Sequence, residues 1–521
     1  MRKLRKVLLG LCILTSMLGI SFSLTGCQGS TGPNLIEVDG YTLRKQEDGT
    51  YALMGIPDEI KYGPSVVYEV PQKIGKYPIS DIGSSYRVAD WARWTKSYMH
   101  YLETVNLRHL IVPDCIESVN TLCQLTIIET DRKISNMQID VHVIDSMKEM
   151  VYFHAPYEEE LAEEYQFISD ENFDNGLLFY ETTDEESGER YVKLAMGMSA
   201  EPIVVPSTYQ GLPVRLSKYA FEGCPAQEVI IEEGITEIPD YCFVESDLQS
   251  ISLPEGLEKI GEGAFNSTQL KELILPDACT SLSDALRGCE TLEKLDLNNA
   301  TMNFMSGSFP NLKTIIVAPT NPTMEYKNEM LYYNTSESKK LVRANAFLTQ
   351  EKVTIDSGVL LGAYAFAGNQ TLKEVFIEAF NTKNRWTLDS KACFMGAAQL
   401  TKVVFGPKIT SVPIDAFKDC AKLEEVVFEN ASMFGDNAFA GCGLKEIHSE
   451  KIHFLCEGVF ADNKNLTKVI IPNCKHIGER GFKGCERLTE CLVGEKCTIS
   501  GEAFADTPLM YVPKFLLCKR S

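Results

Sequence analysis

A short motif, in which a small residue precedes an apolar one, recurs along this chain at a nearly constant spacing. Nine of the eleven intervals between successive apolar members fall between 21 and 23 residues. One unit of that length cannot bury its apolar face alone, so such units stack and share a continuous core. The period therefore predicts an elongated array of coils. The motifs are Ala220-Phe221, Cys242-Phe243, Ala264-Phe265, Ala285-Leu286, Ser308-Phe309, Ala365-Phe366, Cys393-Phe394, Ala416-Phe417, Ala438-Phe439, Val459-Phe460, Gly481-Phe482 and Ala503-Phe504.

A second element keeps the phase of the first and has the form apolar-x-x-apolar-x-apolar, often followed by proline. Leu270, Leu273 and Leu275, followed by Pro276, are one example. The alternating tail is typical of a short strand, and proline ends it because proline has no amide hydrogen for the ladder. The fold class expected is a repeat solenoid, mostly β, with short parallel strands, in two arrays.

The full unit resembles the BspA-type leucine-rich repeat of bacterial surface proteins. It is represented by Leu248…Ile251-Ser-Leu253-Pro254, followed by Ile260-Gly261-Glu-Gly-Ala264-Phe265. The resemblance covers nearly all of residues 212–510 and, more weakly, residues 34–170. It implies a right-handed coil with parallel strands, display on the cell surface, and a role in protein binding or adhesion. The family has no catalytic motif to transfer to this chain.

The N-terminus has the pattern of a bacterial secretion signal. Four basic residues precede an apolar run, Val7–Leu24. A run of that length also suits a membrane-spanning helix, but Leu24-Thr25-Gly26-Cys27 resembles a lipobox. The resemblance implies cleavage before Cys27 and lipidation of its thiol, so we expect an extracytoplasmic protein that is lipid-anchored to the cell membrane. A chance cysteine after glycine is the alternative. The basic residues are Arg2, Lys3, Arg5 and Lys6.

The repeat pattern starts twice, which predicts two arrays. Val70-Pro71…Ile79 parallels Val205-Pro206…Val214. The acidic stretch Glu158–Phe167 is expected to form a short capping helix for the first array. In the second array, Asn321–Asn345 is expected to insert a hairpin around Asn328-Glu329. The expected domains are a lipoprotein signal peptide (1–26), a tether (27–34), a degenerate array with its cap (35–170), a linker (171–176) and a C-terminal array (177–521).

The net charge and the lack of catalytic motifs limit the kinds of function that we expect for this chain. The formal net charge is −22, and removal of the four N-terminal bases would take it to −26. Such a body repels nucleic acid, so we expect no nucleic-acid partner. A basic or neutral partner, or one held by apolar contact, is easier to accept. No nucleophile elbow or phosphate loop occurs and only seven histidines are present; we therefore expect no enzyme activity and no cofactor.

Seventeen cysteines are unusual for an exported chain. Most residues three positions after the recurring Phe or Leu can donate a hydrogen bond, which predicts an inward ladder that satisfies main-chain carbonyls. A disulfide is the alternative, because adjacent coils would place Cys420 and Cys442 about 5 Å apart. The cluster of His448, His453 and Cys456 lacks a zinc spacing, so no metal is expected. The ladder residues are Cys224, Cys289, Asn369, Cys420, Cys442, Asn463 and Cys485.

Two surfaces are candidates for binding an extracellular protein or a glycan. In each strand the residue between the last two apolar positions points outward, and most are apolar. Strand propensity explains the same residues without a partner. The second candidate is Ser84–Tyr101, where Trp91 and Trp94 suit stacking on a sugar or peptide; packing against the solenoid is the alternative. The outward residues are Ile274, Ile316, Phe376, Val404, Val427, Ile470 and Leu492.

Overall fold

The computed structural model describes residues 35–57, 67–82, 109–120, 126–140, 151–156, 159–162, 166–302, 305–378 and 390–510. Cys27, Trp91 and Trp94 lie outside the described residues. The chain forms two units: Met1–Thr182 with Lys193–Met198, and Thr183–Val192 with Ser199–Ser521. No helix within the described part of the chain has the length and apolar character needed to cross a membrane.

Two sheets of mostly parallel strands form the greater part of unit 1. Apolar side chains such as Leu53, Ile82, Val119 and Phe153 are fully buried between them. One sheet has the order β1-β2-β3-β6-β8-β10, with β5 beside β6: β1 (Leu35–Val38), β2 (Tyr41–Lys45), β3 (Tyr51–Gly55), β5 (Lys73–Ile74), β6 (Tyr77–Ile82), β8 (Ser118–Asn120) and β10 (Gln138–Asp140). The other has the order β12-β11-β9-β7-β4: β4 (Val67–Glu69), β7 (His109–Ile111), β9 (Thr126–Glu129), β11 (Val151–His154) and β12 (Gln166–Phe167). A 3-10 turn, η1 (Ile134–Asn136), precedes β10.

The capping helix expected over Glu158–Phe167 is wrong. Within that stretch, Glu159–Leu161 forms one 3-10 turn, η3, and Gln166–Phe167 forms β12. Strand β12 pairs in parallel with β11, and Phe167 packs on Phe153 with ring centroids 5.7 Å apart. The pairing and ring contact extend the sheet by another strand, and they outweigh the helix propensity of the acidic stretch.

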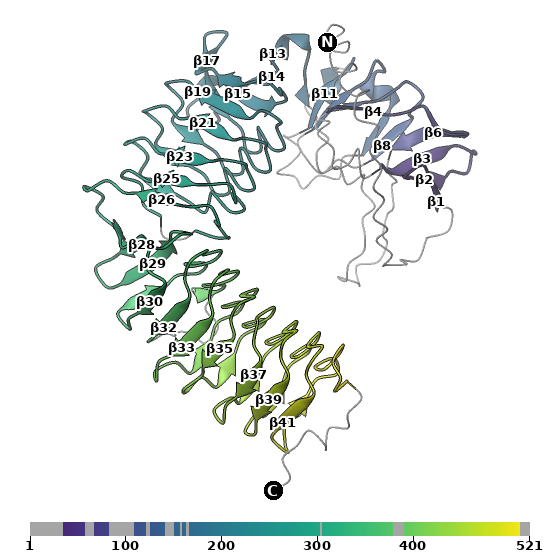
Figure 1. The fold of residues 1–521 in the computed structure, drawn as a ribbon. Coiled ribbons are helices and arrows are strands. Elements are labelled where there is room, and N and C mark those ends of the chain that lie inside the picture. Colours follow the sequence, from purple (N-terminus) through teal and green to yellow (C-terminus); the bar gives the residue numbers. More distant parts are fainter. Residues whose placement is uncertain are drawn as a thin grey trace. The chain divides into compact units, whose positions relative to one another are not determined.

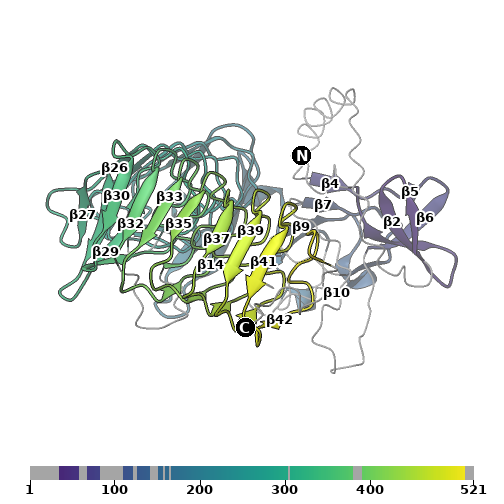
Figure 2. The ribbon, with the colours of Figure 1, turned by 60° about the horizontal axis from the view of Figure 1, so that its bottom comes forward.

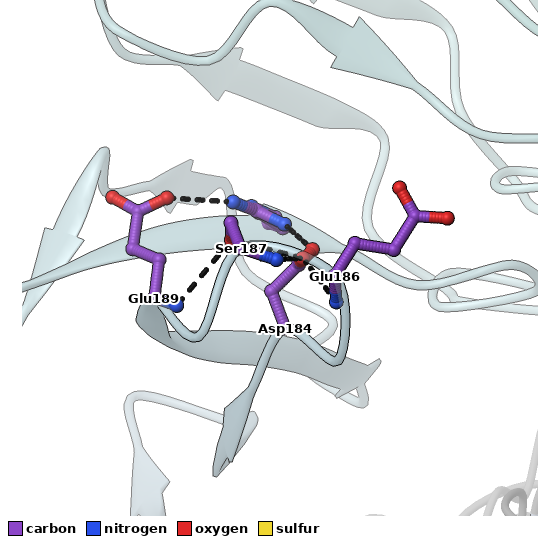
Figure 3. Close-up of polar contacts among 5 residues, drawn as sticks. Asp184, Glu186, Ser187 and Glu189 are labelled. Carbon is purple, nitrogen blue, oxygen red and sulfur yellow. Dashed lines mark hydrogen bonds and ion pairs between the residues drawn. The ribbon is translucent and has the colours of Figure 1, made fainter.

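The expected linker, residues 171–176, carries secondary structure of its own. A 3-10 turn, η4 (Asp170–Asn172), leads into β13 (Phe173–Asp174), which pairs antiparallel with β14 (Leu177–Thr183). The amide and hydroxyl of Ser187 both donate to Asp184 at 2.9 Å in the turn between β14 and β15 (Arg190–Gly197) (Figure 3). Arg215 bridges this turn, donating to Asp184 at 2.9 Å and to Glu189 at 3.1 Å.

Unit 2 is a stack of coils. A first ladder of parallel strands forms one side of this stack. Its strands lie side by side in chain order (Figures 1 and 2) and pair in parallel, except where the ladder is interrupted. They are β16 (Ile203–Val205), β19 (Glu228–Ile231), β21 (Ser250–Ser252), β23 (Glu272–Ile274), β25 (Lys294–Asp296), β26 (Thr314–Ile316), β30 (Lys352–Ile355), β32 (Glu374–Ile377), β33 (Lys402–Phe405), β35 (Glu425–Val427), β37 (Glu446–His448), β39 (Lys468–Ile471) and β41 (Glu490–Val493). The stacked parallel solenoid predicted from the sequence is confirmed.

A second ladder of two- or three-residue strands runs along another side of the same coils. Its strands are β20 (Glu237–Ile238), β22 (Lys259–Ile260), β24 (Ser281–Leu282), β31 (Val359–Leu361), β34 (Ser411–Val412), β36 (Met433–Phe434), β38 (Phe454–Leu455), β40 (His476–Ile477) and β42 (Thr498–Ile499). A short antiparallel pair, β17 (Thr208–Tyr209) with β18 (Leu212–Leu216), precedes the first coils.

The recurring phenylalanines form a buried stack along the third side. Phe394, Phe417 and Phe439 are fully buried, and their ring centroids are 5.2 Å and 5.1 Å apart, with nearly parallel planes. The chain turns tightly here, so residues two before and two after the phenylalanine adopt a left-handed conformation. Asp415 (φ 53°) and Asp419 (φ 61°) flank Phe417 in this way. Aspartate tolerates this region better than most residues, and glycine takes such a position beside other phenylalanines, as Gly441 (φ 69°) does after Phe439.

The predicted hairpin in Asn321–Asn345 is confirmed. Strand β27 (Met324–Lys327) pairs antiparallel with β28 (Met330–Asn334) through a turn at Asn328 and Glu329, both at positive φ. Strand β29 (Lys339–Ala344) returns antiparallel to β28 and pairs in parallel with β31. The hairpin strands therefore join the sheet of β31, which belongs to the second ladder, and add no strand to the first. In the described structure, the first ladder is interrupted between β26 and β30.

Candidate partner-binding surface

A mostly apolar column runs along the outer face of the first ladder, at Val204 in β16 and at the third residue of each later strand. We call it the ribbon. Its exposed members retain between 37% (Phe376) and 51% (Val204) of their accessible surface. They are Val204, Ile230, Ile274, Ile316, Phe376 and Val427.

Three further ribbon residues that the sequence predicts to point outward are half-buried rather than exposed: Val404, Ile470 and Leu492. The strand register places ribbon members directly beside one another. Phe376 pairs with Val404, Val404 pairs with Val427, and Ile470 pairs with Leu492. Adjacent parallel strands are about 4.8 Å apart, so these side chains form continuous apolar stretches.

Sequence reasoning missed the first member of the ribbon. Val204 lies on β16 and pairs with Ile230 of β19. It precedes the first small-apolar motif, so the repeat count excluded it. Ile203-Val204-Val205-Pro206 nonetheless has the same apolar-x-apolar-Pro form as Leu273–Pro276, and that signal was sufficient to find it.

Charged side chains flank the ribbon on one side and pair with each other across neighbouring coils. Lys402 on β33 lies 2.6 Å from Glu425 on β35, and Lys468 on β39 lies 3.0 Å from Glu490 on β41. The other pairs are Lys294–Glu272, Lys313–Glu293, Lys352–Glu374, Lys373–Glu351 and Lys445–Glu424.

These flanking residues are balanced in charge although the chain is strongly acidic. From β23 to β41 they comprise eight lysines and eight glutamates, so their formal charges cancel. The excess of acid in the chain therefore lies elsewhere. The lysines are Lys271, Lys294, Lys313, Lys352, Lys373, Lys402, Lys445 and Lys468, and the glutamates are Glu272, Glu293, Glu351, Glu374, Glu424, Glu425, Glu446 and Glu490.

The seven predicted ladder residues are buried, and each donates a hydrogen bond to a main-chain carbonyl. Cys289, Cys420, Cys442 and Cys485 donate to the carbonyls of Phe265, Phe394, Phe417 and Phe460, with sulfur-to-oxygen distances of 3.0–3.1 Å. Asn463 donates to Phe439 at 2.8 Å, Asn369 to Asn345 at 2.8 Å, and Cys224 to Ser199 at 3.6 Å. No disulfide joins Cys420 to Cys442.

Burial keeps these thiols protonated and therefore able to donate. It raises the pKa of both Cys420 and Cys485 to about 12, because an apolar surrounding disfavours the thiolate. Such thiols are poor nucleophiles and poor metal ligands. Within the described ranges, no three or more His, Cys, Asp or Glu side chains are grouped to hold a metal ion.

The sequence matches the family described as "BspA type Leucine rich repeat region", in six copies over residues 214–339, 342–449 and 387–510. No curated protein matches the chain significantly. Among solved structures, it is similar to a leucine rich cell surface protein from Faecalibacterium prausnitzii A2-165, at 16% identity over 92% of this chain and 99% of that one, with a TM-score of 0.36. It is also similar to a leucine-rich repeat protein from Eubacterium ventriosum ATCC 27560 (18% identity, 66% and 96% covered, TM-score 0.44) and to the pneumococcal vaccine antigen PcpA (18%, 64% and 90%, 0.44).

Proposed function

Since the chain belongs to the BspA-type leucine-rich repeat family, we propose that unit 2 is a surface-displayed module that binds a partner protein. The partner docks on the ribbon and is held by apolar contact. The observation that carries this proposal is the run of Phe376, Val404 and Val427 on three consecutive strands. A contiguous apolar surface rimmed by polar side chains is characteristic of interaction sites.

Strand formation alone does not require an apolar side chain at the ribbon position. Asp296 on β25 occupies the same column, and β25 pairs with both β23 and β26. Ser252 on β21 also occupies it and pairs with Ile230 of β19. The bulky residue at Phe376 is thus not needed for the ladder. Because it is 37% exposed, a partner that covers it gains the free energy of removing apolar surface from water.

The flanking charges favour a partner that does not depend on strong charge attraction. Each lysine in a cross-coil pair already has a glutamate partner, so docking there offers little further Coulomb energy. Exposed pairs of this kind contribute only about 0–1 kcal/mol each. The contact is expected to resemble an ordinary protein interface, with an apolar centre and a polar rim.

The anchor forms the second part of the proposal. Cleavage before Cys27 and attachment of a diacylglyceryl group to its thiol would hold the mature chain on the outer side of the bacterial membrane. Support comes from Leu24-Thr25-Gly26-Cys27 and from the basic residues and apolar run, Val7–Leu24, that precede Cys27. Metabolic labelling with a radioactive fatty acid tests it: the wild-type chain is expected to take up label and Cys27→Ala to take up none.

A pull-down tests the binding proposal. The chain from Gln28 onward is immobilised and exposed to extracellular protein extracts. We expect the variant with Phe376→Ser, Val404→Ser and Ile470→Ser to lose specific partners that the wild type retains. The matched control places Met433→Ser and Phe454→Ser on the second ladder, where these side chains are half-buried and 39% exposed, respectively. Equal capture by both variants, with folding intact by circular dichroism, would reject the ribbon.

The glycan-binding alternative depends on Trp91 and Trp94, which lie outside the described residues, and it stays a prediction. A glycan array probed with the same chain distinguishes the two. Binding to sugars that is lost in the double variant Trp91→Ala and Trp94→Ala, but retained in the ribbon variant, would favour the alternative.

A further inference from the structure

Three cysteines are buried close together in the final coils of unit 2. Cys474, Cys491 and Cys497 retain 2%, 7% and 0% of their accessible surface. Cys474 and Cys497 lie in the turns between the first and second ladders of consecutive coils, where the register of the flanking strands places Cys497 beside Lys475, one residue past Cys474. The amide of Cys474 donates to the carbonyl of Ile471, and the amide of Cys497 donates to the carbonyl of Gly494, three residues back in each case.

The two turns are in close contact. A Cβ atom added to Gly494 would lie 2.8 Å from the carbonyl oxygen of Cys474 and 2.9 Å from that of Pro472, so only glycine lets the main chains approach this closely. Just beyond the turns, His476 on β40 and Thr498 on β42 are paired in parallel. With the one-residue offset, a strand spacing of about 4.8 Å and a rise of about 3.3 Å per residue give a diagonal Cα separation of about 6 Å, within the range of about 4.4–6.8 Å that a disulfide spans.

The thiol groups themselves are also in contact. The Cys497 side chain is the largest cause of the raised pKa of Cys474, which places the two thiols near each other. Each thiol also has a main-chain acceptor, since Cys474 lies 3.3 Å from the carbonyl of His476 and Cys497 lies 3.6 Å from that of Thr498. In the described coils, the turn position holds consecutive cysteines only at this pair. Its other occupants are Ile235, Leu257, Cys279, Ala300, Asn321, Val359, Ile409, Ala431 and Ile452.

We propose that Cys474 and Cys497 are a disulfide-forming pair that staples the last coil to the one before it, with a small-molecule disulfide as the oxidant. The thiolate of one cysteine attacks the oxidant, forms a mixed disulfide and releases one thiol. The thiolate of the other cysteine attacks the protein sulfur of the mixed disulfide and releases the second thiol. Two protein thiols are oxidised, one small-molecule disulfide is reduced, and the two protons leave with the two released thiols.

The pair reacts through local opening of its coils. Contact with the Cys497 thiol and burial raise the pKa of the Cys474 thiol well above its usual range, so a closed coil gives little thiolate. Local opening of packed elements exposes both thiols to the oxidant.

Peptide mapping tests the pair directly. The full chain is purified in reductant, exposed to oxidised glutathione, alkylated and digested with trypsin without reduction. The sequence separates the three cysteines onto different peptides: Val469–Lys475, Leu488–Lys496 and Cys497–Lys514. We expect the first and third peptides to be linked, with the loss of two titratable thiols. Absence of that link, or an equal yield of links to the Cys491 peptide, would overturn the proposal.

Two variants make the result specific. Cys474→Ser with Cys497→Ser is expected to lose the link and remain folded, since serine preserves size. The matched control, Cys420→Ser with Cys442→Ser, removes two consecutive interior thiols and is expected to retain the link. In wild type, bridging should slow amide hydrogen exchange in β41 and β42 relative to the reduced chain, while exchange in β32 and β33 stays the same. The chemistry is independent of partner binding, so failure here leaves the ribbon untouched.

Discussion

The guanidinium of Arg343 lies over the ring of Phe309, with its central carbon 4.6 Å from the ring centroid. It occupies the stack of aromatic rings at the point where the inserted hairpin interrupts the repeat. The group is buried, with 1% exposed, and donates to the carbonyls of Gly307, Tyr364 and Ala367 at 2.7–2.9 Å. One side chain thus joins the coils that precede and follow the insertion, across the site where β26 and β30 share no ladder.

Replacing Arg343 by methionine is expected to destabilise unit 2 by at least about 3 kcal/mol. Methionine keeps the length of the side chain but leaves three carbonyls without a donor, and each buried unpaired group costs about 1–3 kcal/mol. Denaturant unfolding followed by circular dichroism measures the shift of the midpoint. Arg287→Ala, an exposed arginine in the same unit, is the control and should change stability by less than about 0.5 kcal/mol. Equal effects of the two substitutions would contradict the assigned role.

The hydrogen bonds of the ladder residues predict which substitutions among them destabilise the fold most. Asn463 donates to the carbonyls of Phe439, Phe460 and Ala461, so Asn463→Ala is expected to cost about 2–3 kcal/mol. Cys485→Ser retains a donor toward Phe460 and should cost less than about 1.5 kcal/mol. Thermal unfolding of both variants checks the ranking. A larger loss for Cys485→Ser than for Asn463→Ala would refute the view that hydrogen bonding decides this column.

Partner capture is expected to be nearly independent of salt, despite the net charge of −22. Surface charge attraction is largely screened above 0.1 M salt, whereas apolar burial is not. Capture measured at about 0.1 M and 1 M NaCl should therefore agree, and Lys402→Ala with Glu425→Ala should leave it unchanged. A steep loss of capture at high salt would show that charges outside the balanced set carry the contact.

The turn between β14 and β15 should respond to acid. The amide of Ser187, then its hydroxyl, then Arg215 hold the pKa of Asp184 at about 2. A carboxyl whose folded pKa lies below its unfolded value of about 3.9 stabilises the fold above that pH and loses the effect as pH falls towards 2. Asp184→Asn should lower the midpoint of unfolding at pH 6 and have little effect near pH 2. An equal effect at both pH values would contradict this assignment.

Gly261 and Gly256 are expected to differ in how much their replacement by alanine destabilises the fold. A Cβ on Gly261 would clash with the amide nitrogen of Asp240, whereas one on Gly256 would meet nothing within 4 Å. Gly261→Ala is therefore expected to cost about 1–3 kcal/mol through forced main-chain shifts. Gly256→Ala should be neutral or slightly stabilising. Thermal unfolding of the pair measures the difference, and a stable Gly261→Ala variant would mean that these coils separate easily.

The parts of the fold fixed by the local period were predictable from the sequence. The spacing of Phe221, Phe243 and Phe265 specified one coil per repeat, and alternation around Leu273 specified both the strand and the outward face of Ile274. These inferences hold because each repeat contacts mainly its neighbours, so a local pattern determines local structure.

What the period did not specify lies where it is interrupted. Arg343 reads as an ordinary charged residue in a polar hairpin, and its burial depends on Phe309 and Ala367, which are distant in sequence. The stretch ending in Gln166 and Phe167 has a helical composition, but a neighbouring strand and the ring of Phe153 decide its structure. The exposure of Val404 and Ile470 also depends on packing, because side chains on adjacent coils cover part of each.

The register of about 22 residues per coil also bears on how a chain of this kind changes length. A duplicated coil brings its own phenylalanine, ladder donor, ribbon residue and flanking lysine or glutamate. Its junctions repeat contacts that neighbouring coils already make. Gain or loss of one coil would then lengthen or shorten the ribbon by one strand spacing, about 4.8 Å, and the other coils would need no change in sequence. Recombination between repeats therefore offers a direct route to partners of different sizes.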